Sequence, residues 1–95
     1  MDLVEFLHAR LNEDEALIRD GVEAGESNIS LLDLVDIDAK RRIIELHGPA
    51  EYEYADADVC STCDRGGPLP YPCPTLRLLA LPFARHPDYA EAWRP

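Results

Sequence analysis

The chain has 95 residues, of which 46% are hydrophobic and 29% are charged, a composition typical of a globular domain and not of a disordered chain. No hydrophobic run approaches the roughly 18 residues that a membrane span requires, and the N-terminus carries acids where a signal peptide carries bases, so we expect a cytoplasmic protein. The net charge of −10 is concentrated in residues 1–58, which hold 16 of the 19 acids and five of the nine bases; this disfavours general nucleic-acid binding by that half.

The first predicted element is a long amphipathic helix over residues 3–20. Its hydrophobic residues form one stripe of Val4, Leu7, Leu11 and Ile18, widened by Leu3, Phe6 and Leu17. Asp2 can cap its first turn, with Glu5 three residues later as in a capping box. Gly21 predicts its end, and residues 21–28 are typical of a loop.

A second helix is predicted from its cap at Ser30 to His47, where Gly48-Pro49 ends it. Its hydrophobic residues fall on two faces: Leu32, Val35, Ala39, Ile43 and Leu46 on one, and Leu31, Leu34, Ile37 and Ile44 around the rest. This is more apolar surface than one neighbouring helix covers, so we expect pairing with a second copy, a homodimer.

Residues 49–74 are expected to be a loop, since they are rich in proline and glycine and show no strand periodicity beyond residues 52–54. Pro74 can then start a third helix that stops before Pro82. One further helical turn is expected after Pro87. Tyr89 and Trp93 lie in this turn, and Phe83 lies just before it. We expect the three to form a small separate cluster that holds the tail against the third helix.

Three cysteines, Cys60, Cys63 and Cys73, lie in or beside this middle segment. A Cys-x2-Cys pair lets two thiolates reach one ion, and Cys73 stands before the third helix, where free amide groups stabilise a thiolate. His47 is the predicted fourth ligand of a structural Zn2+ site. His86, Asp64, another acid or water remain alternatives for that position, and so do an iron–sulfur cluster or cysteines that are only buried hydrophobic residues.

No catalytic residues are predicted, because the metal-hydrolase, deaminase, phosphate-loop and Ser/His/Asp signatures are absent. A less favoured alternative is a zinc hydrolase in which water replaces His47 and Asp64 or Glu51 acts as the base.

The C-terminal PCPTLRLLALPFARHPDYAEAWRP, the opening DLVEFLHARL and the segment DAKRRIIELH resemble a family of small uncharacterised proteins of actinobacteria and their phages. The resemblance implies an intracellular protein often encoded by mobile elements, with no established activity. In the family pattern a histidine after KRRI, a cysteine pair and the cysteine of Pro-Cys-Pro recur together. These correspond to His47, Cys60, Cys63 and Cys73.

The sequence thus predicts a mainly α fold: an antiparallel helical hairpin, a short third helix and a zinc-stabilised, zinc-finger-like loop. We expect one domain over residues 1–95, with the hairpin in 1–47 and the metal loop and C-terminal helix in 48–95. The predicted function is that of a non-enzymatic zinc-binding module, phage-encoded or host-modulating, that binds a protein partner through its helical and acidic surface. The alternative is a transcription-associated nucleic-acid-binding regulator that uses these cations: Lys40, Arg41, Arg42, Arg77 and Arg85.

Overall fold

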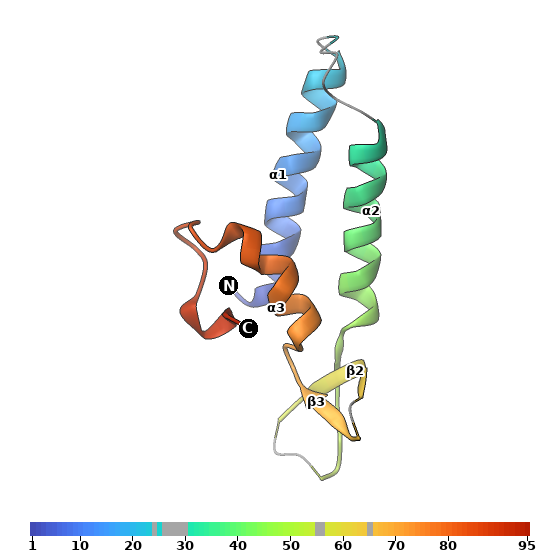
Figure 1. Ribbon diagram of the computed structural model, residues 1–95, viewed down its shortest axis with the longest axis vertical. Helices are drawn as coiled ribbons and strands as arrows, with labels where there is room; N and C mark the ends of the chain where they lie inside the picture. Colours follow the sequence, from blue (N-terminus) through green and yellow to red (C-terminus); the bar gives the residue numbers. More distant parts are fainter. Residues whose placement is uncertain (24, 26–30, 55–56, 65) are drawn as a thin grey trace.

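A computed structural model describes residues 1–23, 25, 31–54, 57–64 and 66–95. Two long helices, a small sheet and a short third helix follow one another along the chain (Figure 1). The elements are α1 (Leu3–Glu23), α2 (Leu31–Leu46), β1 (Pro49–Ala50), β2 (Val59–Asp64), β3 (Pro68–Pro70), α3 (Pro74–Ala80) and the 3-10 turns Leu81–Phe83 and Glu91–Trp93. None of the helices in these ranges is long and apolar enough to cross a membrane.

The N-terminal helix begins as predicted. The Asp2 Oδ1 accepts a hydrogen bond from the backbone N–H of Glu5 at 2.8 Å, which satisfies one of the unpaired donors of the first turn. The predicted stop at Gly21 was wrong, because α1 continues to Glu23. The left-handed backbone expected after a helix occurs at Gly25, whose φ is 74°. The predicted cap Ser30 and most of the predicted loop lie outside the described residues.

The two long helices run antiparallel and side by side (Figure 1), as the predicted hairpin requires. Arg41 of α2 donates to the carboxylate of Glu15 at 2.9 Å and to the amide oxygen of Asn12 at 2.8 Å, both on α1. These contacts lie on the side of α2 that faces α1. Ile37 and Ile44 are buried in the core with α1 residues, and the face that carries Val35 is exposed.

The prediction that residues 49–74 form only a loop was wrong, because three short antiparallel strands lie there in the order β1-β2-β3. Pro49 pairs with Cys60, and Val59 pairs with Pro70. The prolines that argued against strands lie on the two edge strands, where a missing N–H costs little, and the central strand VCSTCD has none. Gly66, with φ of 77°, supplies the left-handed backbone in the turn that follows β2.

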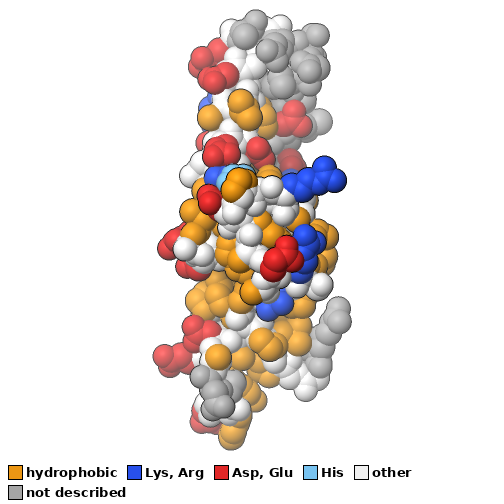
Figure 2. Space-filling view, turned by 90° about the vertical axis from the view of Figure 1, so that its left-hand side faces the viewer, with side chains coloured by type: hydrophobic (Ala, Val, Ile, Leu, Met, Phe, Trp, Pro, Cys, Tyr) orange, Lys and Arg blue, Asp and Glu red, His pale blue; other side chains and the backbone are white. Residues whose placement is uncertain are grey.

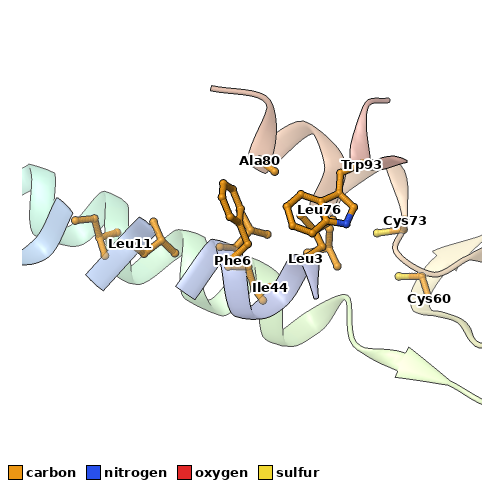
Figure 3. Packing of buried hydrophobic residues seen from close by; sticks show 11 residues of the cluster. Leu3, Phe6, Leu11, Ile44, Cys60, Cys73, Leu76, Ala80 and Trp93 are labelled. Carbon is orange, nitrogen blue, oxygen red and sulfur yellow. The ribbon is translucent and has the colours of Figure 1, made fainter. Parts of the chain in front are cut away.

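The hydrophobic core lies where α3 and the C-terminal tail pack on the lower part of the hairpin (Figures 1 and 3). The ring of Phe6 is fully buried and contacts Phe83, Tyr89 and Trp93, with the Trp93 ring centroid at 5.1 Å. These three aromatic residues were predicted to form a separate cluster on the third helix. That prediction was wrong, because they pack on α1 and Trp93 belongs to the main core.

The molecule is elongated, with extents of 54 × 25 × 17 Å and a radius of gyration of 15.6 Å. A compact chain of this length has a radius of gyration of about 12 Å. The difference arises because the hairpin extends well beyond α3 (Figure 1). The N- and C-termini lie close together beside α3.

Candidate metal centre

Four side chains from three parts of the chain meet at the junction of the hairpin, the sheet and α3. They are His47 at the end of α2, Cys60 and Cys63 of β2, and Cys73 immediately before α3. Their ligand atoms all lie within 4.8 Å of one another. The structure therefore brings together the four residues that the sequence predicted as a set.

The imidazole nitrogen lies at similar distances from all three sulfur atoms. His47 Nδ1 is 3.3 Å from Cys60 Sγ, 3.4 Å from Cys63 Sγ and 3.6 Å from Cys73 Sγ. A tetrahedral ion with sulfur at about 2.3 Å and nitrogen at about 2.0–2.1 Å holds these atoms roughly 3.6 Å apart. The four donors are therefore compatible with a single metal ion. A cluster with several irons would distribute the same ligands over a wider space.

The local structure of β2 brings the first two thiols together and lowers the pKa of one of them. The backbone N–H of Cys63 donates to Cys60 Sγ at 3.4 Å, which closes the turn between them. Burial acts to raise the pKa of Cys60, but the amide groups of Thr62 and Cys63, together with His47, outweigh burial and lower this pKa to about 6. Cys60 is thus a thiolate at neutral pH, the form that binds metals.

The turn between the two cysteines also docks on the end of α2. Both hydroxyl groups, those of Ser61 and Thr62, donate to the carbonyl oxygen of Leu46, and the Ser61 N–H donates to the Gly48 carbonyl at 2.9 Å. The last carbonyls of a helix lack partners within the helix, so these bonds satisfy groups that would otherwise be unpaired. They hold His47 beside the two thiols. No feature of the sequence alone indicates this role for the two hydroxyl residues.

The third thiol occupies the N-cap of α3, as predicted. Cys73 is fully buried, its carbonyl accepts from the N–H of Arg77 at 3.1 Å, and Pro74 follows at the first helical position. Figure 3 shows its sulfur and that of Cys60 at the edge of the core. Burial raises the pKa of Cys63 to about 11, and the neighbouring thiols of Cys60 and Cys73 act in the same direction.

The alternative fourth ligands lie elsewhere or are not described. His86 packs edge-on against Phe6, its Nε2 contacts Arg10, and its Nδ1 accepts from the Asp88 N–H at 3.0 Å. It therefore lies outside the group of donors. Glu51 is exposed, and the side chain of Asp64 lies outside what the structure describes.

The basic cluster on α2 is neutralised by acids. Lys40 pairs with Asp36 at 2.8 Å, Arg42 pairs with Asp38 at 2.9 Å, and Arg41 makes its contact with α1. Cations that already have carboxylate partners have less charge to offer to phosphates. This arrangement gives no support to the nucleic-acid alternative.

The fold and this site define a small, mainly helical protein with a candidate metal centre of three cysteines and one histidine. Residues 33–95, which include all four donors, match the model of a family of unknown function, DUF6221. The match covers more than half of the chain, so the protein belongs to this family. The resemblance seen in the sequence also included the first helix, which lies outside the matched residues. No curated protein and no solved structure matches the chain.

Proposed function

We propose that the protein is a non-enzymatic zinc-binding module that binds another protein through its helical, acidic surface. The observation that carries the proposal is the set of four protein donors at single-ion spacing. Four protein ligands fill a tetrahedral zinc ion and leave no position for water or substrate, which is the arrangement of a structural site. The ion would join the end of α2, the sheet and the start of α3.

A role in host modulation, encoded by a phage or another mobile element, follows from the sequence resemblance and is part of this proposal. Pairing with a second copy is a further part. It is supported by hydrophobic residues on the outer side of α2, where Val35 and Leu46 are 63% and 62% exposed. Light scattering on the zinc-loaded chain tests the pairing, and a Val35→Glu variant should then be monomeric.

The test of the module is a comparison between wild type and Cys60→Ser. Elemental analysis should find one zinc per wild-type chain and little in the variant. Affinity capture followed by mass spectrometry should recover the same protein with zinc-loaded wild type and lose it with Cys60→Ser. Leu78→Ser, at an exposed position outside the donor set, is the matched control. A metal-free wild type, or a partner retained equally by both chains, would contradict the proposal.

A further inference from the structure

A groove runs along one side of the hairpin, between α1 and α2. Four of its lining residues on each helix recur at spacings of four, three and four, so each set forms one stripe. They are Leu7, Leu11, Asp14 and Ile18 on α1, and Asp33, Ile37, Lys40 and Ile44 on α2. The α1 stripe is roughly 16 Å long at 1.5 Å per residue. Lys40 lines both hollows, so the upper and lower parts of the groove adjoin at this residue.

The lower part of this groove is already used by the chain itself. Leu79 of α3, with Pro82 and Phe83 after it, closes the groove over Leu7 and Leu11 and leaves a cavity of about 110 Å³. The packing of α3 on α1 shows that this side of the hairpin accepts a helix with an apolar face.

The upper part of the groove is also lined by residues of both α1 and α2, but no described residue of α3 or the C-terminal tail covers it. We call it the upper groove: about 310 Å³, lined by Asp14, Leu17, Ile18, Asp33, Asp36 and Ile37, with Lys40 at its lower end. Its floor is hydrophobic, and Leu17 is 70% exposed. Its three carboxylates come from both helices, and its single cation is paired with Asp36. A hydrophobic floor between acidic walls is complementary to a basic amphipathic segment.

The charge of the chain selects among occupants. A second copy that placed its own hairpin in this groove would set acids against the three carboxylates of the groove, since residues 1–58 carry 16 acids against five bases, and like charges at an interface are costly. Nucleic acid is repelled by the same carboxylates. Figure 2 shows acidic side chains along the upper part of the molecule and more hydrophobic surface lower down. A basic amphipathic segment of another protein can pair its cations with the carboxylates and bury its hydrophobic residues against the floor.

We propose that the upper groove is the docking site for a helical segment of another protein, with leucine-like residues on one face and lysine or arginine beside them. This inference rests on the proposed function and gives the partner its chemistry. The hydrophobic face of the segment would cover Leu17 and Ile18, above the buried Ile37. Its cations would face Asp14, Asp33 and Asp36.

The test is fluorescence anisotropy with a labelled peptide of about 14 residues, made of leucine and lysine with leucines at helical spacing. A glutamate-for-lysine peptide and a lysine-only peptide serve as controls. We expect the leucine–lysine peptide to bind the zinc-loaded chain at least about tenfold more tightly than either control, because it uses both the floor and the walls.

Matched variants test whether the peptide binds in this groove or is attracted only by the overall negative charge of the protein. Leu17→Gln should weaken binding about five- to tenfold, and Leu78→Gln, at an exposed position on α3 outside the groove, should not. Asp14→Asn with Asp36→Asn should weaken binding about fivefold more than Glu45→Gln with Glu53→Gln, which removes the same charge elsewhere. Equal effects of the two pairs, or no effect of Leu17→Gln, would overturn the inference.

Two further results distinguish this inference from the proposed function. A dimer that Leu17→Gln abolishes would place a second copy in the groove and overturn the inference alone. A natural partner that cross-links outside the upper groove would do the same, and the module would still bind a protein. A zinc-free wild-type chain would instead contradict the proposed function, whatever the peptide result.

Discussion

Replacing Cys73 by serine tests whether this residue is a metal ligand or only a buried residue at the N-cap of α3. Serine is a better N-cap than cysteine, and Cys73 makes no side-chain capping bond, so the cap itself should gain about 1 kcal/mol. Burying a hydroxyl where the fully buried thiol stood costs about 1–3 kcal/mol. Without a metal role, these two terms leave the free energy of unfolding changed by only about 0–2 kcal/mol.

A metal role predicts a much larger effect. A ligand present at 1,000 times its dissociation constant stabilises the folded state by about 4 kcal/mol, and loss of one of the four donors removes most of that. Together with the roughly 0–2 kcal/mol of the substitution itself, this loss should lower the free energy of unfolding of Cys73→Ser in zinc by about 3–6 kcal/mol.

Urea unfolding followed by the fluorescence of Trp93, the single tryptophan, measures this difference in zinc and in chelator. In chelator, wild type and Cys73→Ser should differ only by the metal-independent effect, about 0–2 kcal/mol in the free energy of unfolding. Thr75→Ser, two residues away, is the matched control and should keep the zinc-dependent stability. If Cys73→Ser binds one zinc per chain and keeps the wild-type midpoint in zinc, Cys73 is not a ligand.

Three other outcomes are expected. X-ray absorption on the zinc-loaded chain should show three sulfur neighbours and one nitrogen, and His47→Ala should replace the nitrogen signal by oxygen or abolish binding; a fourth sulfur would exclude His47. Zinc affinity should rise by about tenfold or more per pH unit between pH 6.5 and 8.5, because Cys63, with its pKa raised to about 11, must lose a proton to bind while Cys60 is already ionised above about pH 6; a flat profile in competition titrations would refute this. Phe6→Ala should cost about 3–5 kcal/mol and expose Trp93 to water with a red-shifted emission, since the two rings are in contact; an unchanged spectrum would show that the tail is held by other contacts.

The sequence was informative wherever one local rule decided the outcome. The three helices begin where Asp2, the start of the second hydrophobic run and Pro74 predict. The grouping of the four donors could be predicted, because a Cys-x2-Cys turn, a helix end and a helix start can each be recognised in the sequence.

The sequence was less informative where long-range contacts decide. The short strands form because β2 docks on the end of α2, and nothing in residues 49–74 alone indicates that neighbour. Likewise, α2 has two apolar faces, and packing against α1 decides that the one that carries Ile37 and Ile44 is buried. The helical continuation past Gly21 has a different cause, which is local. A glycine ends a helix only where its backbone is left-handed, and that conformation occurs at Gly25.

The burial of Trp93 against Phe6 joins residues from opposite parts of the chain, because Phe6 lies in the first turns of α1 and Trp93 in the last 3-10 turn. Both belong to the main hydrophobic core. Cleavage by a protease just before Glu91 would therefore uncover the ring of Phe6, although all four donors of the candidate metal centre would stay in the larger fragment.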